Sequence, residues 1–303
     1  MQVSLFLVLI SFSTFIDCIS ATCTVSSEDG VKSLKCQHTS LEEIAEKKHE
    51  TFSSIFITLS KLPSIPANTF ASFGSMVQSL TLQNCQISTL DYDAFNGLTN
   101  LKKLSLANNN ISNVPSEWFN DMRSLEELNL SFNQIKLIEA SVFRKLLNLR
   151  NLILNNNQIN CLIPGDIEPM RSLNNIRIEG NPYNFICRGK LTRWLKDKGV
   201  IYASEEGGFK YREDFLDSLI WRCAIDPEIG SSETKMKECV LLNLYNQLQT
   251  ALVTSCSFPS VAAECINERS ALLNCIQQSG NGNINNGEAV RKLLLALRSG
   301  YKR

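Results

Sequence analysis

The feature that most constrains the fold is the segment Leu101–Ile111, which reads LKKLSLANNNI. Its apolar positions are Leu101, Leu104, Leu106 and Ile111. The alternation of Leu104 and Leu106 around one polar residue predicts a short strand with one buried face. Asn109 follows where this strand would turn into a loop, and its side-chain amide can satisfy backbone groups there. One such segment cannot bury its apolar side alone, so it requires stacked copies.

Copies of the segment recur at a spacing of 24 or 25 residues. Their strand positions begin at Ile55, Leu80, Leu128, Leu152 and Ile176. The position of Asn109 is taken in these copies by Ser60, Cys85, Asn133, Asn157 and Asn181. A phenylalanine also recurs in the second half of the unit, as Phe70, Phe95, Phe119 and Phe143. Chance periodicity in a leucine-rich chain explains neither row, so we assign about six coils to residues 53–180.

The N-terminal segment has the character of a leader. Val3–Ile16 is nearly all apolar, contains no Lys or Arg, and is followed by the small residues Ser20 and Ala21. This pattern is typical of a signal peptide, which we assign to residues 1–21. The apolar run is shorter than the roughly 20 residues of a membrane-spanning helix. We therefore expect a secreted, extracellular protein without a transmembrane anchor.

Charge and cysteine content narrow the class of protein. The 30 basic and 30 acidic residues balance, which gives no indication of a nucleic-acid partner. Eleven cysteines, clustered at the ends of the repeats, indicate disulfides and an oxidising compartment. Cys23 and Cys36 flank a short alternating segment before the first coil. We expect these two to pair within an N-terminal cap, residues 22–52, that covers the open end of the coils.

The residues after the last coil complete a known pattern. They include Asn181-Pro182, Cys187, Trp194-Leu195 and Cys223. Together with the coils, this region resembles the extracellular leucine-rich-repeat family with 24-residue units, the class of Toll-like ectodomains, Slit and lamprey lymphocyte receptors. The resemblance implies an α/β solenoid: a curved horseshoe with a parallel sheet on its concave face and disulfide caps at both ends. It also implies a C-terminal cap, residues 181–225, closed by Cys187–Cys223, because Phe185 replaces the other usual cysteine.

Residues 226–303 predict a C-terminal disulfide-stapled α-helical module. We interpret residues 226–232 as a linker, and expect helices around Leu241–Leu252, Ser260–Ile276 and Glu288–Arg298. Folding the first two helices antiparallel favours Cys239–Cys275 and Cys256–Cys265 among the three pairings that four cysteines allow. The module would serve either as a larger cap or as an assembly element. Some secreted insect immune repeat proteins loosely resemble this plan.

The outward positions of the predicted strands form a mixed, mildly polar surface, with Phe56 and Ile153 as its exposed apolar residues. Isolated apolar residues on a surface are ordinary, and a contiguous patch would be a stronger sign. We nevertheless take this concave face as the candidate ligand surface. The candidate ligand-binding residues are Phe56, Thr58, Thr81, Gln83, Lys103, Ser105, Glu127, Ile153 and Arg177.

Two N-glycosylation sequons begin at Asn110 and Asn129. Asn129 lies between two strand leucines, at the centre of the concave face. A glycan there would shield the centre and move binding to an edge or an end, whereas an unoccupied sequon leaves the face open.

Two cysteines lie inside the coils. Cys85 takes the asparagine position, where we expect a buried free thiol. Cys161 follows the fifth strand segment, and we consider three roles for it: a buried thiol, a partner in the nearby cap, or an intermolecular disulfide.

The sequence gives no indication of catalysis. It contains none of the common nucleophile, zinc or phosphate-loop motifs. Its two histidines, His38 and His49, lack partners at metal-ligand spacing. We therefore expect no enzyme, no metal and no cofactor.

Three functions remain. The chain could be a secreted recognition protein, for example in innate immunity, that binds a protein or microbial-surface ligand. It could be an assembly or scaffold subunit, joined into a homo- or hetero-oligomer through the helical tail or Cys161. It could also be a venom-like effector that imitates a host repeat receptor.

Overall fold

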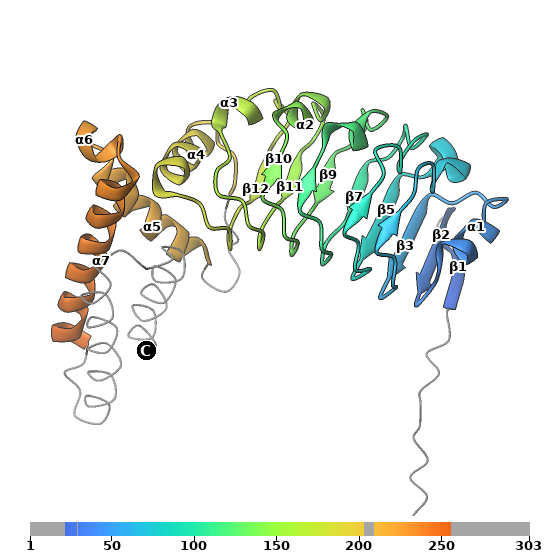
Figure 1. Cartoon of the computed structure of the whole chain (residues 1–303), viewed down its shortest axis with the longest axis horizontal. Coiled ribbons are helices and arrows are strands. Elements are labelled where there is room, and N and C mark those ends of the chain that lie inside the picture. The colour runs from blue at the N-terminus through green and yellow to red at the C-terminus, as the bar shows by residue number, and fades with distance from the viewer. Residues whose placement is uncertain (1–21, 29, 203–208, 256–303) are drawn as a thin grey trace, which may run out of the picture.

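The structure is a computed structural model that describes residues 22–28, 30–202 and 209–255. Over these residues the chain winds into a row of stacked coils followed by helices (Figure 1). One strand from each coil enters a common sheet of 8 strands in the order β1-β2-β3-β5-β7-β9-β11-β12. The β1–β2 pair is antiparallel, and every later neighbour pair is parallel, as a solenoid of repeated coils requires.

The six repeat strands lie where the repeat pattern predicts them, and β1 and β2 of the N-terminal cap precede them. Their bounds are β1 (Thr22–Glu28), β2 (Val31–Gln37), β3 (Ser54–Thr58), β5 (Ser79–Gln83), β7 (Lys103–Ser105), β9 (Glu127–Asn129), β11 (Asn151–Ile153) and β12 (Asn175–Arg177). The strand leucines stand directly opposite one another, from Leu80 through Leu104, Leu128 and Leu152 to Ile176. They are buried, so the solenoid core runs behind the sheet along the whole row.

The other side of the coils carries short elements. These are the strand pairs β4 (Ser64–Ile65) with β6 (Thr89–Leu90) and β8 (Asn113–Val114) with β10 (Leu137–Ile138), the 3₁₀ helices η1 (Ala71–Met76) and η2 (Ser116–Phe119), and the helices α2 (Ala140–Lys145) and α3 (Pro164–Ile167). The recurring phenylalanines lie beneath them as a buried row; the rings of Phe70 and Phe95 stack with centroids 6.1 Å apart. The strand leucines and the recurring phenylalanines therefore form the core together.

The asparagine row links each coil to the one before it. Asn133 is buried; its Oδ1 accepts a hydrogen bond from Ile111 N at 3.1 Å, and its Nδ2 donates to Leu106 O at 2.9 Å. Asn109, Asn157 and Asn181 make the equivalent bonds in their coils. Ser60 occupies the first position of the row, where its hydroxyl accepts from Thr39 N at 3.1 Å. Backbone groups that the turns leave unpaired are thus satisfied.

The N-terminal end is closed by the β1–β2 hairpin and α1 (Leu41–Glu46). The predicted Cys23–Cys36 disulfide is present across the hairpin. Ser40 and Glu43 form a capping box at the start of α1, in which each side chain accepts a hydrogen bond from the other residue's backbone N–H.

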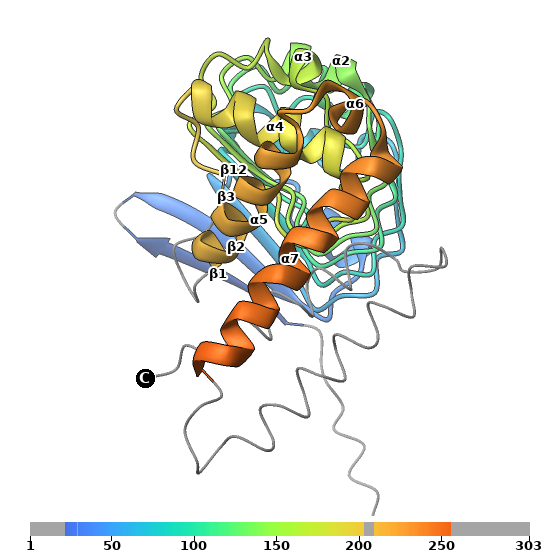
Figure 2. The same cartoon turned by 90° about the vertical axis from the view of Figure 1, so that its left-hand side faces the viewer.

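The C-terminal end is covered by four helices, α4 (Phe185–Asp197), α5 (Phe209–Cys223), α6 (Pro227–Gly230) and α7 (Glu233–Ser255). A second apolar cluster joins them; its buried members are Phe185, Leu216, Leu219, Ile220, Cys223, Met236, Val240 and Leu244. Figure 2 shows α7 crossing this end of the row of coils. The expected helix around Leu241–Leu252 is therefore present as part of α7.

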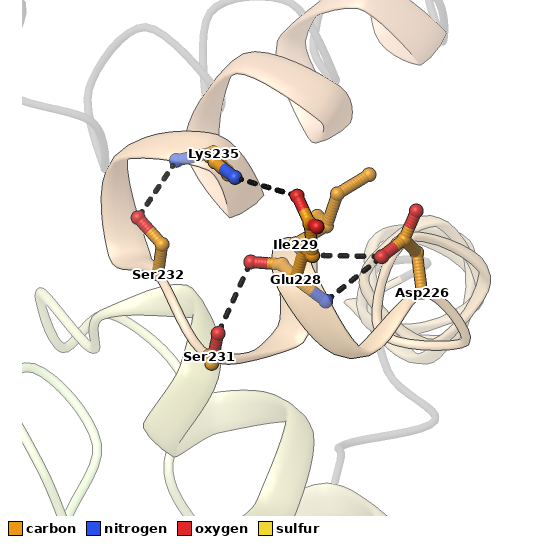
Figure 3. A network of polar contacts seen from close by, with 6 residues as sticks. All are labelled: Asp226, Glu228, Ile229, Ser231, Ser232 and Lys235. Carbon is orange, nitrogen blue, oxygen red and sulfur yellow. Dashed lines mark hydrogen bonds and ion pairs between the residues drawn. The ribbon is translucent and has the colours of Figure 1, made fainter.

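The segment that we interpreted as a linker contains α6. Asp226 begins this helix, and its Oδ1 accepts hydrogen bonds from Glu228 N at 2.8 Å and Ile229 N at 3.4 Å (Figure 3). Lys235 of α7 reaches back, and its Nζ lies 3.0 Å from Glu228 Oε2. Pro227 in the first turn and this Asp cap favour a helix over an open linker.

The disulfides at this end differ from those expected. Cys187 pairs with Cys161, and Cys223 pairs with Cys239. The expected pairs Cys187–Cys223 and Cys239–Cys275 are therefore wrong, as is an intermolecular role for Cys161. The remaining expectations, Cys256–Cys265 and the two later helices, lie outside the described residues.

Stacking explains the corrected pairs. Asn184 N donates to Asn160 O at 3.1 Å, so the start of α4 lies beside the coil loop that carries Cys161. The Cα atoms of Cys161 and Cys187 are 5.5 Å apart, a distance that a disulfide spans. Cys223, at the end of α5, faces α7, where Cys239 stands.

Candidate binding face

The outward side chains of the repeat strands form one row in register, which we call the sheet face. Its central line comprises Phe56, Thr81, Ser105, Asn129, Ile153 and Arg177, each directly opposite the next. All six are partly exposed, whereas the leucines on either side of them are buried. The period-2 alternation of a strand places these side chains together, as the sequence predicts.

The flanking candidates lie on the same strands. Thr58 and Gln83 stand opposite each other at the ends of β3 and β5, and Lys103 stands opposite Glu127 at the starts of β7 and β9. Lys103 Nζ lies 3.7 Å from Glu127 Oε2, with side chains 64% and 34% exposed. Such an exposed pair contributes little to stability, so both charges are free to turn toward a ligand.

Asn129 differs from the other members of the row. Its Oδ1 accepts hydrogen bonds from Ser131 N at 3.0 Å and from Ser131 Oγ at 2.7 Å. Ser131 is only 5% exposed. The hydroxyl of this sequon is thus buried and hydrogen-bonded in the folded chain, whereas Asn110 and Ser112 of the other sequon are both exposed.

The C-terminal end of the sheet face borders a buried polar cluster. Arg188 Nε donates to Asp217 Oδ1 at 2.8 Å, and Tyr202 OH donates to Asp217 Oδ2 at 3.0 Å. Burial raises the pKa of the nearby Tyr183 hydroxyl above its usual range. Within the described part of the chain, Arg177 Nη1 has no hydrogen-bond partner. The Arg188–Asp217 contact joins α4 to α5, and the Tyr202–Asp217 contact joins the segment after α4 to α5.

Sequence reasoning missed two hollows beside the face. One, of about 540 Å³, lies at the N-terminal end and is lined by His38, Thr39, Ser40, Glu43, Leu59, Ser60, Lys61, Asn84 and Gln86. The other, of about 290 Å³, is lined by Lys102, Ser124, Glu126, Asn148, Arg150 and Ser172. In the second hollow, Lys102, Glu126 and Arg150 occupy the same position in successive coils, as do Ser124, Asn148 and Ser172. Aligning the coils in the sequence reveals these two rows, but not that they enclose a hollow.

The remaining candidates are placed as follows. Cys85 is a buried free thiol, as expected, and burial raises its pKa. His38 and His49 are exposed in the N-terminal cap. Among the described residues no group of His, Cys, Asp and Glu side chains could hold a metal ion, and no helix has the length and apolar character to cross a membrane.

Comparison with known proteins identifies the repeats. Residues 75–135 and 123–182 match the family model described as leucine rich repeat. No curated protein matches the chain. Leucine-rich repeats are a protein-interaction module, so the matched residues are of a kind that mediates binding.

Two solved structures illustrate the likeness. A complex of TLR13 with the single-stranded RNA ssRNA13 is 27% identical over 52% of this chain and 23% of its own, with a TM-score of 0.43. A leucine-rich-repeat protein of Leptospira interrogans is 25% identical over 54% of this chain and 39% of its own, with a TM-score of 0.46. The chain thus spans less than half the length of either protein.

Proposed function

We propose that this chain, whose residues 75–182 carry leucine-rich repeats, is a secreted, non-enzymatic recognition protein that binds a protein ligand. The sheet face is the binding surface, on the concave side of a curved solenoid, and innate-immune recognition is the role that we assign to it. The match of these residues to leucine-rich repeats supports the binding role.

The observation that carries the proposal is the sheet face itself. The backbone of its strands is fully paired from β3 to β11, so what the face offers a ligand is side chains. Phe56 and Ile153 provide apolar surface near its two ends. The small residue Thr81 lies beside Phe56, and Ser105 lies beside Thr81 on the next strand. An aromatic side chain that stands above small polar neighbours can be buried by a ligand. In such interfaces a few anchor residues contribute most of the binding free energy.

The centre of the face is proposed to remain free of glycan. Ser131 is buried and its hydroxyl is already bound to Asn129, which disfavours modification of the folded sequon. The exposed Asn110 stands outside the sheet strands, so a glycan there leaves the central row accessible.

The test compares two double variants of the full chain. In F56A/I153A, the apolar anchors of the sheet face are removed; in L137A/L147A, two exposed leucines away from that face are removed. Captured partners from extracellular fluid are identified by mass spectrometry, and their affinity for each variant is measured. Loss of the two anchors is expected to weaken binding by about 30-fold or more, since each hot-spot truncation costs about 1–2 kcal/mol. Equal binding by both variants would remove the sheet face from consideration.

A second candidate function, an assembly subunit, has support of its own. Cys161 is already paired with Cys187, so it cannot join two chains. Cys239 of the helical extension pairs with Cys223, so it is not available to the cysteines that follow it. The three cysteines that follow Cys239 are Cys256, Cys265 and Cys275, an odd number. One of them therefore lacks a partner among the three and is available to another chain. A venom-like effector would use the same sheet face as a receptor, and only its ligand distinguishes it.

A further inference from the structure

The two ends of the eight-stranded sheet are finished differently. At the C-terminal end, β12 is covered: Ile176 N donates to Ile201 O at 2.7 Å, and Ile201 N donates to Asn174 O at 3.0 Å. At the N-terminal end, β1 pairs with β2 on one side, and among the described residues no strand pairs with its other side. β1 is thus an edge strand with one row of backbone groups open to another strand.

The hydrogen-bond pattern identifies which β1 residues face outward. Lys32 O of β2 accepts from Ser53 N at 2.9 Å, so the even-numbered residues of β2 turn their backbone groups toward β3. Cys36, one of these, stands opposite Cys23 with Cα atoms 4.1 Å apart, the short spacing of a pair that is not hydrogen-bonded. In a pair that is not hydrogen-bonded, both residues direct their backbone N–H and C=O groups away from each other. The β1 residues that stand opposite the even-numbered residues of β2 therefore direct these groups away from β2. Cys23, Val25 and Ser27 therefore direct their N–H and C=O groups to the open edge.

This edge lacks the usual protection against pairing. β1 contains no Pro, Lys or Arg, its only charged residue is Glu28 at its end, and its register with β2 runs one to one without a bulge. Natural edge strands are commonly blocked by such residues or by bulges. Val25, at the centre of the strand, is also 43% exposed. Figure 2 looks from the C-terminal end, and there the blue β1–β2 hairpin projects sideways past the coils in front of it.

We propose that two copies of this chain associate through β1, antiparallel about a two-fold axis at Val25, so that their sheets become one continuous sheet. In this register Val25 stands opposite Val25 of the second copy, and Cys23 stands opposite its Ser27. All outward N–H and C=O groups of the three residues then find partners, because the outward set is symmetric about Val25.

A second copy fits this edge better than an unrelated strand. The two-fold register places Glu28 opposite the uncharged Thr22, so no like charges meet. It also brings the two exposed Val25 side chains together on one side of the sheet, where each covers the other. Because the axis stands perpendicular to the sheet, the two sheet faces point the same way and lie side by side. The dimer would present two ligand surfaces in one direction, which raises avidity for a repeated ligand.

The test is a charge exchange at the axis, with the purified full chain and its mass measured by sedimentation equilibrium. In V25K two lysines would stand opposite each other, and in V25E two glutamates would. Each variant alone is expected to dimerise at least about tenfold more weakly than wild type, because directly opposed like charges destabilise a strand pair. An equal mixture of the two is expected to regain the dimer, since Lys then stands opposite Glu.

The matched control is V31K. Val31 is 45% exposed in the same hairpin but belongs to β2, away from the open edge. Its dimerisation should equal that of wild type, and its thermal unfolding reports whether a lysine in the hairpin disturbs the fold. All of these chains carry Cys256→Ser, Cys265→Ser and Cys275→Ser, so that no disulfide between chains can hold two copies together when the β1 contact is lost. A wild-type chain that stays monomeric at the highest concentration reached, or a dimer that V25K and V25E leave unchanged, overturns the proposal.

Discussion

Single residues carry the clearest link between sequence and structure in this chain. The asparagine row was predicted because the same requirement recurs in every coil: one amide bridges backbone groups of its own coil and of the coil before it that would otherwise be unpaired. Cys85 was predicted for the same reason, since its position in the row fixes its burial. For Cys161, a partner in the nearby cap was one of the three roles considered, but the choice of Cys187 could not be predicted, because it depends on where α4 lies against the last coils. No pattern in the residues around Cys161 encodes that placement.

Replacing Asn133 by Ala is expected to lower the free energy of unfolding by about 3 kcal/mol, because buried backbone groups in two coils lose their partners. Asn148→Ala is the control: its amide is exposed and donates one bond, to Arg123 O at 2.8 Å. We expect that variant to lose about 0.5 kcal/mol or less. Urea-induced unfolding measures both, and equal losses would contradict the role assigned to the row.

At Phe132 the backbone conformation, and not the side chain, is expected to decide the effect of a substitution on stability. Its φ is 55°, in the left-handed region, where Asn108 and Asn156 occupy the equivalent positions of neighbouring coils. Phe132→Gly is therefore expected to be more stable than Phe132→Ala by about 1 kcal/mol, the reverse of the usual order. At the exposed strand residue Leu137, Ala should be at least as stable as Gly. Melting temperatures of the four variants give the two orders, and an Ala advantage at position 132 would refute the expectation.

At the scale of elements, the helical end is less independent of the coils than the sequence suggested. Glu233, at the start of α7, accepts hydrogen bonds through Oε1 from Phe185 N at 2.7 Å and through Oε2 from Ile186 N at 3.0 Å. One helix thus caps the N-terminus of another that lies 47 residues or more earlier in the chain. The sequence showed α7 through its apolar stripe, but not what α7 packs against, because the contact joins distant residues.

Glu233→Ala is expected to lower the stability of the helical end by about 2 kcal/mol, because two N–H groups of α4 lose a charged acceptor. Hydrogen exchange of the first turn of α4 should accelerate by more than about tenfold. Glu228→Ala is a matched control, since its carboxylate is 83% exposed and pairs only with Lys235 among the described contacts. Unchanged exchange in Glu233→Ala would show that α7 does not hold α4.

At the scale of the whole molecule, the cysteine count sets an expectation about assembly. Outside the predicted leader, which contains Cys18, six cysteines form the three disulfides, Cys85 is buried, and Cys256, Cys265 and Cys275 remain. We expect the secreted chain to run at about twice its reduced mass on a non-reducing gel. Cys85→Ser should leave that band unchanged. A single monomer band, together with one thiol that reacts without unfolding, would contradict covalent assembly.

The solenoid follows from the repeat, and so does the set of side chains on the sheet face; the ligand does not, because no pattern in the coils specifies it. The most direct test of the central claim replaces Phe56 by a photoreactive phenylalanine analogue and, as a control, places the same analogue at Leu147, which is exposed away from the face. After irradiation with the captured ligand, we predict a covalent adduct at position 56 and none at position 147. An adduct at position 147 with none at position 56 would contradict ligand binding on the sheet face.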